Sequence, residues 1–300
     1  LNISREMLRN NPQVAAIRKA VTGRLLSELE ATATRDAKAY EKIYETFGAV
    51  LKEGIYEDHE RREQILKLAR FRSTAGEGFR SLTEYVAALR PNQTAIYYLV
   101  GDSLDRLQAS PQLEAARAHG VEVLLMTDQV DHFWTTVPAG FEGKPLKSLT
   151  HGDVDWSLIP LADGSPAPAA GDSDPAVGVL IARMKIALAG QVGDVKSSQR
   201  LVESAACLVA GGDGHDLGLE RLLQRQSRGL GARPVLELNP RHALIKAVAA
   251  KAAAGASPVV DDIARLIHDQ ALILEGEAPG EPAGFARRLT EVLLQAVAKL

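Results

Sequence analysis

Ala95-Ile96-Tyr97-Tyr98-Leu99-Val100 is a short apolar run rich in strand-forming residues, and Gly101-Asp102 ends it. Ser110-Pro111 then begins a helix that stops at Gly120, and a second apolar run follows at 121–126. Two strands joined through a helix by short connections predict a parallel pair with a right-handed crossover. The centre of the chain therefore predicts a small α/β unit.

Helical periodicity, with apolar residues every three or four positions, precedes this unit. The expected helices lie at 12–30, at about 40–51 with Gly54 ending it, at about 58–70, and from Ser81 to Arg90, with a break at 74–78 before the last of them. Beyond the second strand, residues 129–137 favour a further helix and residues 145–149 a third strand. A helical block thus leads into the α/β unit.

A stretch without apolar periodicity divides the chain. Residues 162–175 consist largely of Ala, Pro, Gly, Ser and Asp, which is typical of a linker that builds no core. The expected organisation is a first domain at 1–155, a linker at 156–175 and a second domain at 176–300.

The second domain predicts helices mixed with strands. Its expected elements are a helix at 176–190, strands within 192–210, a helix at 215–227, a strand at 234–238, a helix capped by Asn239, and two final helices near Pro258 and Pro282. The expected fold class combines α/β and α+β. A helical block with a small αβα unit and a short parallel sheet is followed by an α+β domain ending in two amphipathic helices.

Composition limits the class of protein. The 300 residues are 46% hydrophobic and 24% charged, as is ordinary for a globular protein in water. The net charge of −3 gives no basic field for nucleic acid, and no run of 18 apolar residues predicts a membrane span. The single cysteine, Cys207, lies in an apolar run and is expected in a core, and one cysteine suits a reducing cytoplasm.

No complete active site is recognisable in the sequence. The chain lacks a G-x-x-x-x-G-K-[ST] loop, a G-x-G-x-x-G fingerprint between a strand and a helix, and a G-x-S-x-G elbow. No set of His, Cys, Asp and Glu has metal-ligand spacing, so no metal site is expected. Gly211-Gly212-Asp213-Gly214 resembles a phosphate cradle in composition only and favours a turn. These residues indicate binding surfaces rather than catalysis.

Two features suggest where such surfaces lie. Phe133 and Trp134 are neighbours on a short predicted helix, where adjacent side chains point about 100° apart, so an exposed aromatic is expected. The alternative is that both pack inside a small domain. The last two predicted helices carry apolar stripes. They either fold back on their own domain or meet the same pair from a second chain in a four-helix bundle.

Six motifs along nearly the whole chain follow one order. They are Leu1-Asn2-Ile3-Ser4-Arg5-Glu6-Met7-Leu8-Arg9 and the segments 47–58, 68–74, 96–99, 121–128 and 236–242. Together they resemble the motifs of the ninety-kilodalton heat-shock chaperones, from the later middle domain to the C-terminal domain. The chain ends Val297-Ala298-Lys299-Leu300 without the acidic peptide of eukaryotic cytosolic members, which favours the bacterial type. Because the first motif starts at once and without Met, we expect a longer natural protein.

The resemblance implies the C-terminal half of an ATP-dependent molecular chaperone of the cytoplasm. ATP with Mg would bind the missing N-terminal domain, and Arg5 would contact the γ-phosphate there. Arg9 stands where the family usually has a glutamine and is the second candidate for such a contact. No cofactor and no ATP hydrolysis are expected of this fragment alone. The residues alone, without the resemblance, favour a surface arginine at Arg5 that is paired with Glu6 or another carboxylate.

The resemblance also implies a homodimer that binds non-native client proteins, with no nucleic-acid or membrane partner. Client contacts are expected at Phe133 and Trp134, and at His215 and Leu219 on the 215–227 helix, for which an ordinary core helix is the alternative. The expected dimer interface consists of Ile263, Leu266, Ile267, Phe285, Leu289, Val292, Leu293 and Val297. A dimerisation scaffold without client binding and a small α/β enzyme are the alternative functions.

Overall fold

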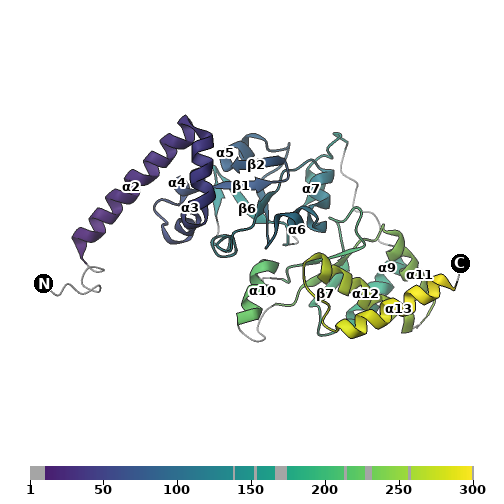
Figure 1. Ribbon diagram of the computed structural model, residues 1–300. Coiled ribbons are helices and arrows are strands. Elements are labelled where there is room, and N and C mark those ends of the chain that lie inside the picture. The colour runs from purple at the N-terminus through teal and green to yellow at the C-terminus, as the bar shows by residue number, and fades with distance from the viewer. Residues whose placement is uncertain are drawn as a thin grey trace, which may run out of the picture.

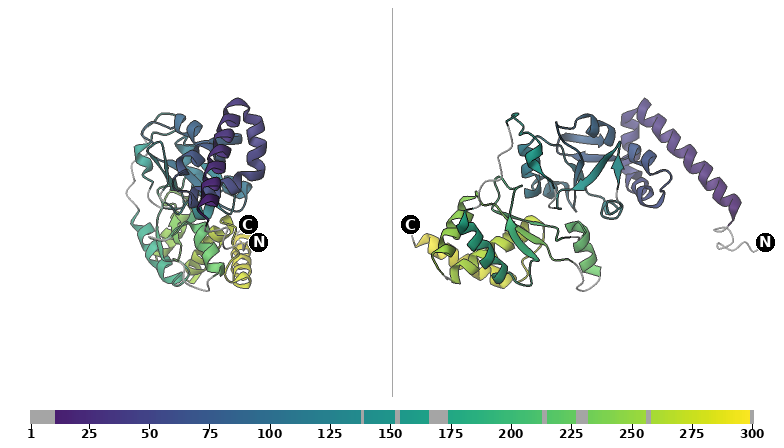
Figure 2. Two further views of the ribbon diagram at one scale, coloured as in Figure 1. Left: turned by 90° about the vertical axis from the view of Figure 1, so that its left-hand side faces the viewer. Right: turned by 180° about the vertical axis from the view of Figure 1, so that it is seen from behind.

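The computed structural model describes residues 11–137, 139–151, 154–165, 174–212, 215–226, 232–255 and 258–298. Arg5 and Arg9 lie outside these residues. The described elements form two units, each built on its own sheet (Figure 1). The first unit runs from α2 to η2 and the second from α9 to α13. Figure 2 shows the same two assemblies from the end and from behind.

The first unit contains seven described helices and one mixed sheet. The helices are α2 (Pro12–Arg35), α3 (Ala37–Glu57), α4 (Arg62–Leu68), α5 (Leu82–Ala87), α6 (Leu104–Gln108), α7 (Glu114–Ala118) and α8 (Asp131–Trp134), with 3-10 turns η1 (Pro111–Leu113) and η2 (Trp156–Leu158). The strands are β1 (Arg70–Ser73), β2 (Gly76–Ser81), β3 (Ile96–Val100), β4 (Leu124–Met126), β5 (Gly140–Phe141) and β6 (Lys144–Ser148), in the order β2-β1-β4-β3-β6-β5. β3 is parallel to β4 and β6, which confirms the predicted parallel pair.

Layers of side chains cover both faces of this sheet. Along β3, Tyr98 points into a core formed with α3, α4 and α5, whereas Tyr97 points into a second core formed with α6, α7 and η2. Every residue of β3 is buried, as expected for a parallel strand covered on both sides. The central run therefore appears in the sequence as continuous apolar residues.

The helical block differs from the prediction at several boundaries, including α2, which runs to Arg35, and α5, which ends at Ala87. α3 continues through Gly54 to Glu57. A Cβ at position 54 would collide with the Ile65 side chain of α4, so Gly54 permits a close contact between the two helices and does not end α3. α4 ends at Leu68. The segment predicted to be only a break at 74–78 contains the two-residue turn Thr74–Ala75 of the antiparallel β1–β2 hairpin and the start of β2, in which Gly76 and Gly78 both have positive φ.

The second unit combines five described helices with a small sheet. Its elements are α9 (Pro175–Ala187), β7 (Asp194–Ser197), β8 (Ala206–Val209), α10 (Leu217–Gln226), β9 (Val235–Leu238), α11 (Ala243–Ala253), α12 (Pro258–Leu274) and α13 (Pro282–Val297). β9 is central, parallel to β7 and antiparallel to β8. α9, α11 and α12 pack one core with this sheet. None of the described helices in either unit is long and apolar enough to cross a bilayer.

Two local predictions in the second unit have different outcomes. Cys207 is buried in β8, as predicted, and burial raises the pKa of its thiol. Asn239 does not cap the next helix, because α11 begins at Ala243 with His242 as its cap. The Asn239 side chain instead accepts from the Arg241 N–H at 3.0 Å and donates to the Ser204 carbonyl at 3.0 Å, which holds the turn after β9.

The first part of the expected linker packs against the first unit. Trp156 and Ile159 are buried in the core that η2 shares with α6 and α7. The Trp156 ring lies 5.7 Å from the Tyr97 ring and 5.5 Å from the His119 ring, centroid to centroid. Residues 166–173 lie outside the described part, and the domain limits stay a prediction.

Candidate functional site

α8 points one of its two adjacent aromatic side chains into the core and the other toward solvent. Trp134 is fully buried, and its indole Nε1 donates to Asp131 Oδ1 at 2.7 Å. Phe133 is 45% exposed. The expected angle between neighbours on a helix therefore gives one residue inside and one outside. The predicted client contact at Trp134 needs correction, because its ring belongs to the core beside Phe71.

A buried ion-pair cluster fixes α8 to α3. Lys52 Nζ lies 2.8 Å from Asp128 Oδ2 and 2.9 Å from Asp131 Oδ1. Burial alone lowers the pKa of Lys52, but the two carboxylates outweigh it and raise that pKa, so the ammonium stays charged. Burial raises the pKa of Asp131, and Lys52 opposes that rise. The position of Phe133 thus depends on residues that sequence reasoning missed. No local spacing of residues marked this pairing in the sequence, because Lys52 lies 76 positions from Asp128.

The structure brings the two predicted client segments together. α10 contacts α8, and a Cβ on Gly218 would collide with the His132 ring, so the close approach requires glycine. His215 is exposed before α10, and its N–H donates to Glu220 Oε1 at 3.0 Å. Leu219, in contrast, is buried. Leu219 therefore needs correction as a surface contact, which favours the core-helix alternative for that side of α10.

Polar side chains hold α10 and its unit against the first unit. The Asp216 carboxylate accepts from the Thr150 hydroxyl at 2.7 Å and from the Ser148 hydroxyl. Buried Arg200 donates to Gln112 Oε1 at 2.9 Å, while Glu237 Oε2 neutralises it at 3.0 Å. Because these groups are satisfied across the contact, they fix α10 beside α8.

The Glu114 side chain adds a second fastening between the units. Its carboxylate accepts from the backbone N–H groups of Val202, Glu203 and Ser204, at distances between 2.6 and 3.2 Å. A single carboxylate on α7 thereby orders the loop before β8. Of the residues in these contacts, only Glu237 lies within one of the six sequence motifs, the segment 236–242.

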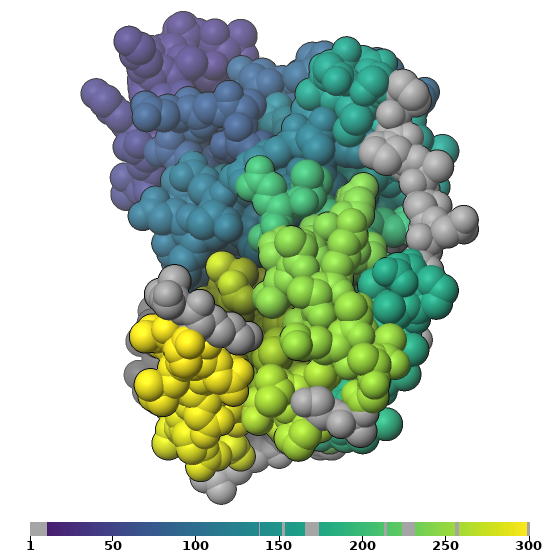
Figure 3. Space-filling view, turned by 90° about the vertical axis from the view of Figure 1, so that its right-hand side faces the viewer, coloured from purple at the N-terminus to yellow at the C-terminus, as the bar shows by residue number. Residues whose placement is uncertain are grey.

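The eight residues of the expected dimer interface divide between two environments. Ile267 on α12 is buried in the core of the second unit, and Ile263 and Leu266 beside it are partly covered. α13 lies on the surface (Figure 3, yellow), where Leu293 is 56% and Val297 65% exposed. Leu289 is also exposed, and Phe285 and Val292 are half-buried. The prediction that Ile267 lies in the dimer interface needs correction, because its side chain is already packed in the core of the second unit.

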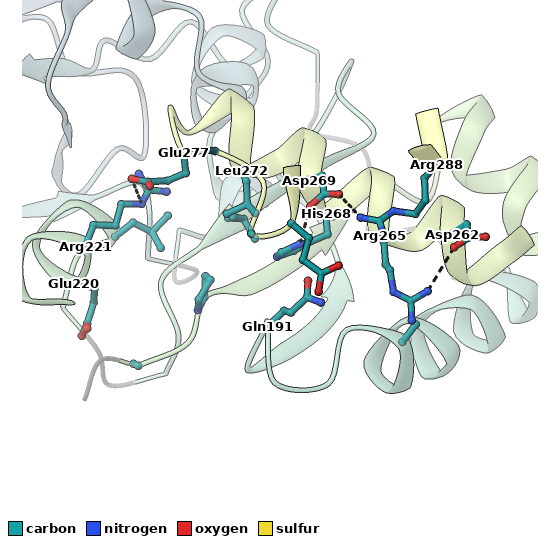
Figure 4. A pocket seen from close by; sticks show the side chains of 18 of the residues that line it. Gln191, Glu220, Arg221, Asp262, Arg265, His268, Asp269, Leu272, Glu277 and Arg288 are labelled. Atoms are coloured by element: carbon teal, nitrogen blue, oxygen red, sulfur yellow. Dashed lines mark hydrogen bonds and ion pairs between the residues drawn. The ribbon is translucent and has the colours of Figure 1, made fainter. Parts of the chain in front are cut away.

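A cavity of about 860 Å³ lies beside the contact of α12 and α13 (Figure 4). Arg288, the one buried residue of α13, donates from Nη2 to Asp269 Oδ2 of α12 at 3.1 Å. His268 is buried next to Asp269, with Nδ1 4.0 Å from Asp269 Oδ1, and neither of its ring nitrogens has a hydrogen-bond partner among the residues that the structure describes. Burial lowers the pKa of His268, so its ring is neutral near pH 7. Sequence reasoning missed these residues.

No group of three or more His, Cys, Asp or Glu side chains in the described part of the chain is arranged to hold a metal ion. Apolar side chains are exposed beside buried ion pairs at two of the predicted places: Phe133 alone beside α10, and a stripe along α13. A contiguous exposed stripe of this kind is typical of contacts between polypeptides.

Comparison with known proteins identifies the family of the chain. The model of the family described as "Hsp90 protein" matches residues 1–299. The "Chaperone protein HtpG" of Rhodopseudomonas palustris (strain BisA53) is 52% identical over 301 residues, which are 99% of this chain and 47% of the relative. The protein of the same name from Mesorhizobium japonicum is 48% identical, over 100% of this chain and 48% of the relative. The chain spans about half the length of the curated relatives it matches. It belongs to the Hsp90 family of chaperones.

Proposed function

We propose that this chain is the client-binding and dimerising half of an ATP-dependent chaperone of the cytoplasm. The observation that carries the proposal is the exposure of an apolar stripe along α13 in the second unit, together with the exposed Phe133 ring in the first. Monomeric proteins seldom leave such surfaces uncovered without a partner. One surface takes non-native client protein, and the other takes a second copy of the chain.

The client surface consists of Phe133 with the exposed beginning of the α10 segment at His215. The Lys52–Asp131 pair and the Asp216 contacts hold these two segments in place before a client arrives. A preordered aromatic loses little conformational entropy on binding, which suits it as an anchor. Trp134 and Leu219 support this surface from inside.

Suppression of aggregation of an unfolding test protein examines the client surface. Phe133→Ala is expected to lose most of the effect, whereas Leu158→Ala, a matched truncation at a 59% exposed position of the same unit, is expected to keep it. Equal protection by the unchanged chain and Phe133→Ala would remove Phe133 from the proposal. No protection by the unchanged chain would favour the alternative, a dimerisation scaffold without client binding.

The dimer surface consists of Phe285, Leu289, Val292, Leu293 and Val297 on α13, with Ile263 and Leu266 of α12 beside it. Two copies related by a two-fold axis would bury these stripes against each other in a four-helix arrangement. Sedimentation equilibrium is expected to give a dimer that Leu289→Asp with Leu293→Asp converts to a folded monomer. Val179→Asp with Ile186→Asp, exposed positions on α9, is the control that should remain dimeric. A monomeric unchanged chain contradicts the proposal.

ATP chemistry belongs to the full-length protein in this proposal. ATP with Mg would bind in the part that precedes this chain, and Arg5 would bind the γ-phosphate, since a guanidinium grips phosphate oxygens through parallel N–H bonds. Arg9 is the second candidate for that contact. In the complete polypeptide, Arg5→Ala should lower kcat for ATP hydrolysis strongly while ATP affinity changes little, and the 300-residue chain alone should show no turnover. Saturable turnover by the 300-residue chain would contradict this assignment.

A further inference from the structure

α8, which carries the exposed Phe133 ring, is too short to hold its own conformation. It spans Asp131–Trp134 and contains 4 residues, whereas isolated helices shorter than about 12 residues are marginal in water. Val130 at its N-cap position makes no side-chain hydrogen bond to the first turn. The direction in which Phe133 points must therefore be set by contacts of α8 with other parts of the molecule.

The Asp131 carboxylate makes these contacts. Its Oδ1 accepts from Trp134 Nε1 at 2.7 Å and lies 2.9 Å from Lys52 Nζ. Its Oδ2 accepts from the Asp128 N–H at 3.0 Å and from Lys52 Nζ at 3.0 Å. Both oxygens thus have two donors, and hydrogen bonds to a charged acceptor are among the stronger ones in proteins. The carboxylate ties the residue before the turn, Asp128, to the last residue of α8, Trp134.

Lys52 brings the anchoring charge to this group from α3, a helix of 21 residues. Its side chain is 4% exposed, and Nζ lies 5.0 Å from the centroid of the Phe71 ring, which packs beside Trp134. Burial lowers the pKa of Lys52, but the carboxylates of Asp131 and Asp128 outweigh burial and raise it. The ammonium group therefore stays charged and holds α8 against a much longer helix.

We infer that Lys52 is the positioning residue of the client surface and acts through Asp131, which holds α8 with Phe133 directed to solvent. The inference deepens the proposed function and rests on Phe133 being a client contact. Lys52 itself touches no client, because its side chain is buried. A ring that is already held in place loses less conformational freedom when a client binds, so Lys52 raises client affinity without a contact of its own.

Stability alone explains the buried pair poorly. Replacing a buried ion pair by apolar residues of similar volume is often neutral or stabilising, because the two charges must be taken out of water. Apolar residues at positions 52 and 131 would lack direction, however. Hydrogen bonds require a narrow range of angles, so the four bonds to Asp131 select one orientation of α8, whereas apolar contacts allow several. Orientation is what the pair of Lys52 and Asp131 supplies.

Client affinity in a double-mutant cycle tests the inference. The probe is fluorescently labelled, reduced and carboxymethylated lactalbumin, which is permanently unfolded, and its anisotropy reports binding to the 300-residue chain. Lys52→Met should weaken binding about tenfold, the upper end of the cost of ordering one side chain. In the Phe133→Ala background the same change should have little further effect, because Lys52 acts through Phe133.

Three further variants separate positioning from a general loss of stability. Arg80→Met breaks the Arg80–Glu122 pair of the same unit, with Nε and Oε1 2.8 Å apart, and should leave client affinity unchanged. Lys52→Arg keeps the charge and should keep most of the affinity. Lys52→Met alone leaves a buried carboxylate without its partner. Lys52→Met with Asp131→Asn removes that charge as well, and it should fold and bind the probe as weakly. Circular dichroism shows whether each variant is folded.

A second readout does not depend on a client. In protein labelled with 4-fluorophenylalanine, the fluorine NMR signal of Phe133 is assigned by its absence in Phe133→Leu. This signal should be a single line in the unchanged chain and should broaden or split in Lys52→Met, because α8 then takes up several orientations.

Each outcome decides the inference. A Phe133 signal that is the same in Lys52→Met and in the unchanged chain overturns it, as does unchanged affinity of Lys52→Met for the probe. A loss of affinity that is equally large in the Phe133→Ala background also overturns it, because Lys52 then acts by another route. A changed Phe133 signal in a chain that does not bind the probe at all would support the positioning while contradicting the proposed client surface.

Discussion

α12 and α13 carry similar amphipathic patterns, yet they lie in different environments. α12 buries Val260, Ala264, Ile267 and Ala271 in the core of the second unit. α13 buries only Arg288 and leaves its leucines on the surface. The comparison teaches that periodicity identifies an apolar face but not what covers it.

The neighbours of each helix explain the difference. α12 contacts β8, α9 and α11, so its apolar face closes the core above the sheet. α13 contacts α12, and the buried Arg288–Asp269 pair fastens it. Burial of the α12 face therefore stabilises the fold, whereas the α13 stripe remains available for association.

The largest expected effect comes from truncating matched positions on the two helices. Ile267→Ala removes a buried side chain and leaves a cavity, which should lower the free energy of unfolding by about 3 kcal/mol. Leu293→Ala should lower it by about 0.5 kcal/mol or less in the monomer, since an exposed side chain loses little packing. Urea unfolding at low protein concentration measures both.

Equal losses in the two variants would break the comparison, because α13 would then be as much a part of the core as α12. The Leu293→Ala variant should instead weaken association, visible as a concentration-dependent midpoint that differs from that of the unchanged chain.

Local sequence signals predicted the elements that rest on local physics. The apolar run at 96–100 gave a buried parallel strand, and Ser81 begins α5 as expected, in a capping box that it forms with Glu84. The β1–β2 hairpin was missed, because β1 spans only four residues and β2 begins with Gly76-Glu77-Gly78, which indicates a break rather than a strand. Gly54 was misread as a helix end, because only the packing of Ile65 shows why a glycine is there.

The buried polar contacts could not be predicted from the sequence. Lys52 pairs with carboxylates more than 70 positions away, and Gln112 meets Arg200 across 88 positions. Such pairs have no local spacing that marks them, and a lysine on a helix is normally a solvated residue. Exposure of Phe133 and burial of Trp134 likewise depend on where Asp131 is held.

A smaller effect is expected from breaking the ion pair that attaches α13 to α12. Arg288→Met leaves Asp269 buried without its partner, which should cost about 2 kcal/mol, below the value for a fully buried pair because water enters the adjacent cavity. Arg288→Met combined with Asp269→Leu should recover most of the loss. Urea unfolding of the two variants measures it. A double variant as unstable as the single one would show that the pair itself, rather than the stranded charge, holds α13.

The smallest expected effect is a pH dependence that originates at His268 on α12. Burial lowers the pKa of His268 below its ordinary 6.5, with Asp269 opposing the shift, so the unfolded chain takes up a proton at higher pH than the folded one. Stability should therefore fall as pH drops from 7 through 6.5, with a slope no steeper than about 1.4 kcal/mol per pH unit for one proton.

His268→Gln removes this proton uptake and should flatten the dependence between pH 5.5 and 7.5, as measured by urea unfolding at each pH. The difference between the two proteins cancels the effects of all other titrating groups. Parallel curves would mean that water in the cavity already hydrates the ring, and the buried face of α12 would then be less dry than the comparison with α13 requires.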